Sequence, residues 1–144
     1  MFTNDIFWAA FWAWLCAQVL KVFWDLAVHR RLDFARLLGA GGMPSSHAAL
    51  VSGLSAAVIT RYGWDNPLTA ISLVFSLIVM YDAAGVRRAV GKQARILNQL
   101  LASIQHGGPT GQEKQQLKEL LGHTPVEVLA GATLGAAIAW WFVS

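Results

Sequence analysis

The stretch VEVLAGATLGAAIAWWFV at residues 126–143 determines the fold class. It carries a single charge, on Glu127, and it nearly matches the ~20 helical residues that cross a bilayer. Its many glycines and alanines let helices approach one another closely inside a membrane. Thr124 and Pro125 precede it as a predicted N-cap and first helical residue. The stretch therefore predicts a spanning helix with close helical neighbours.

Three more apolar runs precede this one, at residues 6–28, 45–62 and 67–86. Only 13% of the 144 residues are charged, whereas soluble domains carry about 25%. The length fits one domain. We therefore expect an all-α integral membrane protein, a single domain over residues 1–144 with about four transmembrane helices.

The segment between the third and fourth runs, residues 87–124, is polar. Residues 87–121 include six Lys or Arg and several Gln, and Gly107-Gly108-Pro109 divides them into two short helical patterns. Neither pattern is apolar enough to span a bilayer. We expect a polar helical excursion that lies on or beside the membrane.

Positive charge predicts the orientation. With four spans, one side of the membrane holds the loops at 29–44 and 87–124, and the other holds both termini and Arg61. The first side carries Arg30, Arg31, Arg36, Arg87, Arg88, Lys92, Arg95, Lys114 and Lys118. Cytoplasmic loops carry the excess of Lys and Arg, so we expect this side to face the cytoplasm of a bacterial inner membrane, with both termini opposite.

The first of three polar clusters is Gly41-Gly42-Met43-Pro44-Ser45-Ser46-His47, at the start of the second run. Glycines let backbone approach a ligand, and a helix N-terminus favours anions, phosphate above all. Ser45 and Ser46 add hydroxyl donors. The alternative is a serine-capped helix with His47 packed at an interface.

The second cluster, Tyr81-Asp82-Ala83-Ala84-Gly85-Val86-Arg87-Arg88, closes the third run. A carboxylate at membrane depth is costly and usually has a functional partner. Asp82 could orient Arg87 or Arg88 toward a phosphate. Arginines just outside a spanning helix are equally expected as topology signals.

The third cluster is Gly122-His123-Thr124-Pro125-Val126-Glu127. His123 and Glu127 are four residues apart, so both could lie on one face. A carboxylate bonded to one imidazole nitrogen leaves the other available for attack. A helix cap beside a charged residue is the alternative.

Taken in order, the three clusters resemble the divergent branch of the type 2 phosphatidic acid phosphatase superfamily, which also includes vanadium haloperoxidases. Pro44-Ser45-Ser46-His47 is similar to the superfamily's Pro-Ser-Gly-His element, with Ser46 in place of Gly. The resemblance implies that His123 becomes a phosphohistidine and that His47 protonates the leaving alkoxide. Glu127 stands where the superfamily has an orienting Asp.

Two superfamily motifs are absent. The usual Ser-Arg pair upstream of the second histidine is missing, since Leu117 occupies the arginine's expected place, with Lys118 beside it. The Lys-x6-Arg-Pro motif has only Lys21, Arg30, Arg31 and Arg36 as stand-ins. Arg87 and Arg88 are the remaining candidates for a phosphate clamp.

Three functions fit the pattern. The first is a lipid-phosphate phosphatase, without metal or cofactor, acting on phosphatidylglycerophosphate or phosphatidic acid. In it His123, His47 and Glu127 are catalytic, and Lys21, Ser45, Ser46, Arg87 and Arg88 bind phosphate. The second is a non-catalytic protein that binds anionic headgroups. The third is a transporter subunit lined by Lys21, Asp25 and Glu127. We expect a membrane lipid partner, no nucleic acid, and a possible homo-oligomer.

Overall fold

The computed structural model describes residues 4–29, 42–104 and 122–144 of the chain. Every element in these residues is helical: α1 (Asp5–His29), α3 (Ser46–Tyr62), α4 (Pro67–Tyr81), a π-helical turn η1 (Asp82–Val86), α5 (Arg87–Ile104) and α6 (Pro125–Val143). The expected all-α class is confirmed.

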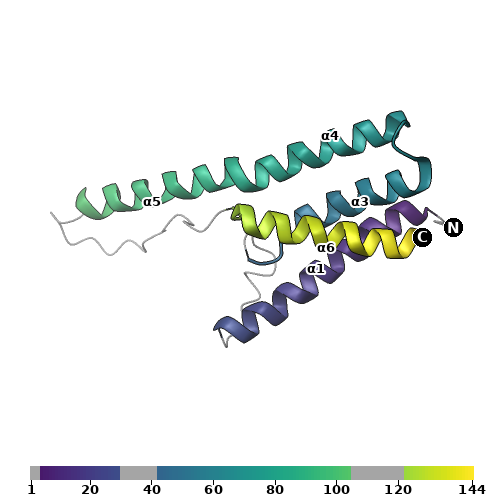
Figure 1. Cartoon of the computed structure of the whole chain (residues 1–144). Helices are drawn as coiled ribbons and strands as arrows, with labels where there is room; N and C mark the ends of the chain where they lie inside the picture. The colour runs from purple at the N-terminus through teal and green to yellow at the C-terminus, as the bar shows by residue number, and fades with distance from the viewer. Residues whose placement is uncertain (1–3, 30–41, 105–121) are drawn as a thin grey trace.

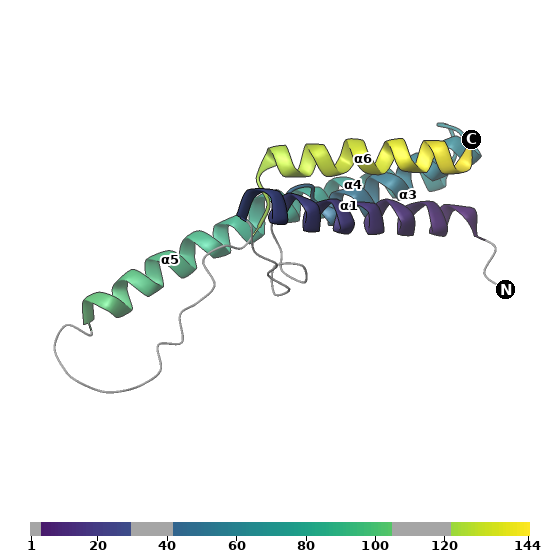
Figure 2. The same ribbon diagram turned by 90° about the horizontal axis from the view of Figure 1, so that it is seen from below.

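Helix α3 lies at the centre of the bundle and packs against α6, α1 and α4, while α1 and α6 also touch each other. Figures 1 and 2 show α1, α3 and α6 side by side, with both ends of the chain at the same end of the bundle. Helix α5 continues beyond the other helices, away from the bundle (Figure 2).

Glycine brings α3 and α6 into backbone contact. A Cβ atom on Gly131 would collide with the carbonyl oxygen of Ser45, and one on Gly135 with the carbonyl oxygen of Ala49. One turn further along α3, a Cβ on Gly53 would lie 2.8 Å from the Ala13 Cβ of α1 and 3.4 Å from the Gly135 carbonyl oxygen of α6. Small residues that allow such approach are typical of helix interfaces in membranes.

Hydroxyl groups hold α3 to α4. The Oγ atoms of Ser55 and Ser76 lie 2.7 Å apart, and the Ser76 hydroxyl donates to the Val51 carbonyl over 2.8 Å. Both serines are buried, so these hydrogen bonds satisfy polar groups that would otherwise be costly in an apolar bundle.

The predicted helix starts agree with the observed ones. Ser45 caps α3 by accepting from Ala48 N–H over 3.3 Å, and Asn66 caps α4 through Leu68 N–H over 2.9 Å. Thr124 caps α6, with Pro125 as its first residue. These capping rules are local, which is why the sequence alone predicted the start at Thr124 and Pro125 and offered a serine cap before His47 as an alternative.

Three of the described helical segments are long and apolar enough to cross a membrane: Asp5–Ala27, Pro67–Leu101 and Pro125–Val143. Helix α3 has 17 residues, at the short end of the spanning range. The chain thus has three or four helices of this kind, with α3 enclosed by the others.

The third predicted run does not end as a helix at Val86. The chain passes from α4 through η1 directly into α5 and remains helical to Ile104. Gly85 is the only helix-disfavouring residue near this junction, and a single glycine costs a helix only about 1 kcal/mol. After Val86 the chain becomes polar and changes from a π-helical turn to an α-helix, but it remains helical.

Candidate active site

Two histidines from distant parts of the chain meet at one end of the bundle. His47 lies in the first turn of α3, and His123 lies two residues before α6. Their ring centroids are 6.1 Å apart with the ring planes at 70°, an edge-to-face arrangement. His123 is 2% exposed, whereas His47 is partly buried. At this spacing both imidazoles can contact one small ligand.

The N-terminus of α3 is fastened to the first turn of α6. The Ser45 N–H donates to the Glu127 carbonyl over 3.0 Å, next to the contact between Ser45 and Gly131. The beginnings of two helices therefore lie side by side, each presenting partial positive charge at its N-terminus. Such ends attract anions.

A main-chain hydrogen bond positions His123. Its N–H donates to the carbonyl of Ala83 over 3.0 Å, and Ala83 belongs to the π-helical turn η1. Turns of this kind are rare and occur frequently at functional sites. Sequence reasoning missed this support, because no residue pattern in Asp82–Val86 distinguishes a π-helical turn from an α-helical one.

Glu127 caps the helix on which it lies. Its Oε2 atom accepts from Thr124 N–H over 3.0 Å, while its own N–H donates to Thr124 Oγ1 over 3.3 Å. This reciprocal pair is the capping box that the sequence left open as an alternative. The cap uses one acceptor site of a carboxylate that has several. The predicted orientation of His123 by Glu127 remains a prediction.

Lys21 reaches the same place from α1. It is 2% exposed, and its side chain runs along Gly42, where a Cβ would come within 2.8 Å of Lys21 Cε. The carboxylates of Asp25 and Glu127 act electrostatically on its ammonium group. Lys21 thus brings a buried amino group from α1 to the chain before α3, within electrostatic range of Glu127 in α6.

The serines of the first cluster are also buried here. Ser45 is 0% exposed and Ser46 is 5% exposed. The Ser45 hydroxyl accepts the capping bond from Ala48, so it serves the helix start. Ser46 is the first residue of α3, next to His47.

The structure does not test the predicted arginine clamp. Asp82 is half-buried in η1, whereas the side chains of Arg87 and Arg88 lie outside the described part of the chain. The other stand-ins and the residues at the missing Ser-Arg pair also lie outside it: Arg30, Arg31, Arg36, Leu117 and Lys118. Their contribution to phosphate binding stays a prediction.

The described residues together form a site suited to an anion. Two imidazoles, one ammonium group and two helix N-termini gather at one end of the bundle. Imidazoles can act as nucleophile or as proton donor, and cations stabilise negative oxygens.

The sequence of the chain is similar to that of known proteins. Residues 2–138 match the family described as the Divergent PAP2 family. The chain is 41% identical over 140 residues to a Bacillus subtilis (strain 168) protein named "Uncharacterized membrane protein YuiD", covering 88% of this chain and 89% of that protein. No solved structure gives a significant match.

Proposed function

Because this chain belongs to the Divergent PAP2 family, we propose that it is a membrane lipid-phosphate phosphatase that works through a phosphohistidine. The observation that carries this proposal is the pairing of His47 and His123, whose ring centroids are 6.1 Å apart. Hydrolysis of a phosphate monoester requires a nucleophile at phosphorus and an acid at the leaving oxygen. Two imidazoles at one site can supply both.

In the first step a ring nitrogen of His123 attacks phosphorus while the bond from phosphorus to the alkoxide oxygen breaks. His47, as imidazolium, gives its proton to that oxygen, and the lipid alcohol leaves. In the second step a water molecule attacks phosphorus and gives a proton to neutral His47. The phosphorus–nitrogen bond breaks, which releases inorganic phosphate and restores His123.

Positive groups hold the phosphate during both steps. We assign this role to the Lys21 ammonium, the N–H groups at the start of α3, and the hydroxyls of Ser45 and Ser46. Arg87 and Arg88 complete the clamp, oriented by Asp82. Glu127 stabilises the positive imidazole of His123 as the nitrogen–phosphorus bond forms. Preorganised charges of this kind stabilise the oxygens of a transferring phosphoryl group.

The substrate is a lipid made on the cytoplasmic leaflet, such as phosphatidylglycerophosphate or phosphatidic acid. The loops at the end of the helices that holds the site carry the excess of Lys and Arg. This excess supports a site on the cytoplasmic side of the membrane. The apolar helices around the site support a substrate that arrives from the bilayer.

The test measures phosphate release from detergent-solubilised protein and from two single variants. We expect His123→Ala to lose at least about 10³-fold in kcat with a lipid phosphate and with an aryl phosphate, because the nucleophile is gone. His47→Ala should lose about 10²- to 10⁴-fold with the lipid alcohol. It should lose much less with the aryl ester, whose phenolate leaves without a proton. Equal release by wild type and His123→Ala would disprove the mechanism.

A second function is favoured by the missing Ser-Arg pair, since Leu117 stands at the arginine's expected place. A site that lacks this pair could bind an anionic headgroup without cleaving it. This alternative predicts that radiolabelled lipid phosphate binds to wild type and to His123→Ala alike, with no label trapped on His123 and no phosphate released by either protein.

A further inference from the structure

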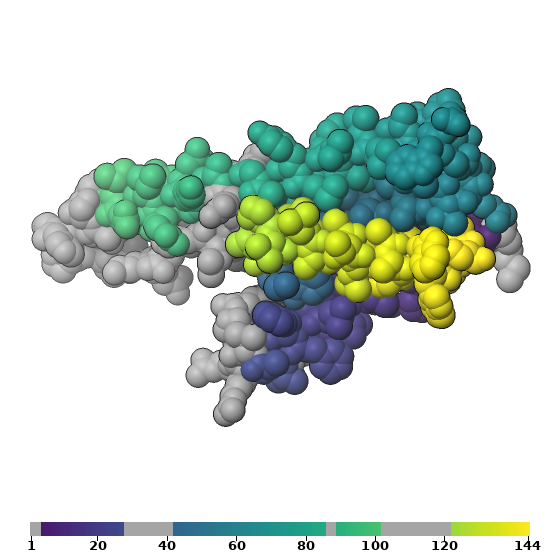
Figure 3. Space-filling view, viewed as in Figure 1, coloured from purple at the N-terminus to yellow at the C-terminus, as the bar shows by residue number. Residues whose placement is uncertain are grey.

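An apolar cavity of about 420 Å³ lies beside the proposed active site, between α1 and α6. Its α1 wall is the stripe Leu20, Phe23, Trp24 and Ala27, which recurs at the spacing of one helical face. Figure 3 shows the C-terminal half of α1 standing away from the start of α6. The cavity follows from this separation.

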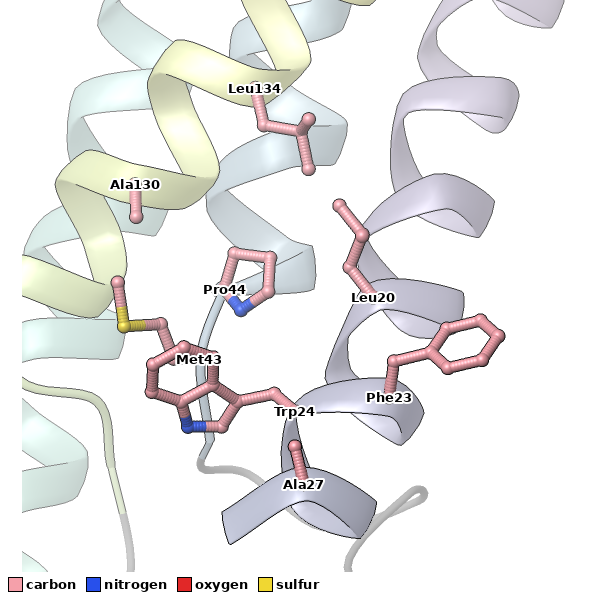
Figure 4. Close-up of a pocket in the computed structure, with 8 residues that line it drawn as sticks. All are labelled: Leu20, Phe23, Trp24, Ala27, Met43, Pro44, Ala130 and Leu134. Atoms are coloured by element: carbon pink, nitrogen blue, oxygen red, sulfur yellow. The ribbon is translucent and has the colours of Figure 1, made fainter.

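The other walls come from the segments that build the site. Met43 and Pro44 form the base, and Ala130 and Leu134 of α6 form the side opposite α1. In Figure 4 these side chains and Leu20 point toward a common space, whereas the Phe23 ring points outward. Because Phe23 is 63% exposed and Trp24 is 49% exposed, the cavity is a groove open to the surroundings of the bundle.

Residues that are adjacent in the chain lie on different sides of the boundary between groove and site, with polar residues on the site side and apolar residues on the groove side. On α1, Lys21 of the site adjoins Leu20 of the groove. Before α3, Gly42 touches Lys21, Met43 and Pro44 line the groove, and Ser45 bonds to Glu127.

On α6 the same division appears between Gly131, which touches Ser45, and Ala130, which faces the groove. Three separate segments thus contribute both to the close contacts around Lys21 and Ser45 and to one apolar groove. Such a boundary fits a ligand that is itself charged at one end and apolar along its length.

The groove runs from the site toward the middle of the bundle. Leu20 lies one turn before Trp24 on α1, and Leu134 lies one turn after Ala130 on α6, both in the direction of the chain termini. A phosphate held at the beginnings of α3 and α6 would therefore have Leu20 and Leu134 below it, toward the middle of the bundle. A membrane lipid has this same order of charge and hydrocarbon.

We infer that the groove binds one acyl chain of the lipid whose phosphate occupies the site of His47 and His123. This inference rests on the proposed function. A helix from a second copy fits less well, because it carries no charged head that would match the polar side of the boundary at Lys21 and Ser45.

The experiment uses phosphatidic acid with a photoreactive diazirine in one acyl chain, irradiated with the full-length protein in lipid nanodiscs and mapped by mass spectrometry. We expect labelled peptides that contain Met43 or Trp24. Ala130→Phe should lower this labelling by about ten-fold, since one added group in an apolar pocket can discriminate by that factor. Ala70→Phe is the matched control, because Ala70 is an exposed α4 residue outside the groove. It should leave labelling unchanged.

Labelling spread evenly over all lipid-facing helices, or equal in Ala130→Phe and wild type, would overturn the groove assignment. Crosslinks between two copies of the chain at Leu20 or Leu134 would also overturn it. Phosphate release is measured on the same samples. Groove labelling without any release would refute the phosphatase and retain acyl-chain binding, so the two failures can be distinguished.

Discussion

Where α1, α3 and α6 meet, the two ends of the bundle are packed by different kinds of side chain. At the end that holds the chain termini, the buried residues are Ala9, Ala57 and Ala139, with Ile6 and Val143 packed against them. At the other end the fully buried side chains include Lys21, Ser45 and His123. The same helices are therefore joined by apolar contact at one end and by polar groups at the other.

This difference separates stability from function within one bundle. Small apolar side chains need no hydrogen-bond partners, so close packing is sufficient to join the helices at the end that holds the chain termini. Buried polar groups at membrane depth are costly and are usually functional. Here main-chain bonds from Ser45 to Glu127 and from His123 to Ala83 hold that end together. We expect substitutions at the two ends to affect different measurements.

The largest effect is expected where the two kinds of packing meet, at Gly131. Gly131→Ala places a Cβ against the Ser45 carbonyl, which must push the start of α3 away from α6. Overpacking of this kind costs about 1–3 kcal/mol. Both the thermal denaturation midpoint and phosphate release should fall. Gly85→Ala is the matched control, because a Cβ there meets nothing within 4 Å. Equal effects in the two variants would contradict the close contact.

A smaller effect, restricted to function, is expected for Lys21→Met. This change keeps most of the buried volume and removes the ammonium group, so KM for a lipid phosphate should rise about 10- to 100-fold. The denaturation midpoint should stay level or rise, because an apolar residue in place of a buried charge is often neutral or stabilising.

Lys92→Met is the control for Lys21→Met, since Lys92 is exposed on α5. It should change neither KM nor the midpoint. A lower midpoint with unchanged KM in Lys21→Met would show that Lys21 acts as a structural counter-ion for Asp25 and Glu127.

The smallest effect is expected at the contact between α3 and α4, away from the histidines. Ser76→Ala removes the hydroxyl that joins Ser55 and the Val51 carbonyl, at a cost of about 0.6 kcal/mol or somewhat more. The midpoint should fall slightly while activity per folded molecule is unchanged. Ser72→Ala should cost less, because the Ser72 hydroxyl bonds within its own helix to Thr69. A loss of activity in Ser76→Ala would show that this contact supports the site.

Sequence alone predicted the features that follow from short-range rules. The serine cap before His47 and the helix start at Thr124-Pro125 depend on neighbouring residues and agree with the structure. The two histidines could be assigned to one end of the bundle because each begins a helix on the same side of the predicted membrane. Their catalytic roles came from the resemblance and remain to be tested.

Only the tertiary structure decided which groups touch. The contact of Gly131 with Ser45, the path of Lys21 along Gly42, the Ala83 carbonyl that holds His123, and the groove beside Trp24 all depend on how helices rotate and cross. Helix rotation is the sum of many weak packing contacts between residues far apart in the chain. No local sequence pattern predicts the total of these contacts. Capping residues and the polarity of each segment, in contrast, are visible in the sequence, and they determine where each helix begins and whether it can contact lipid or water.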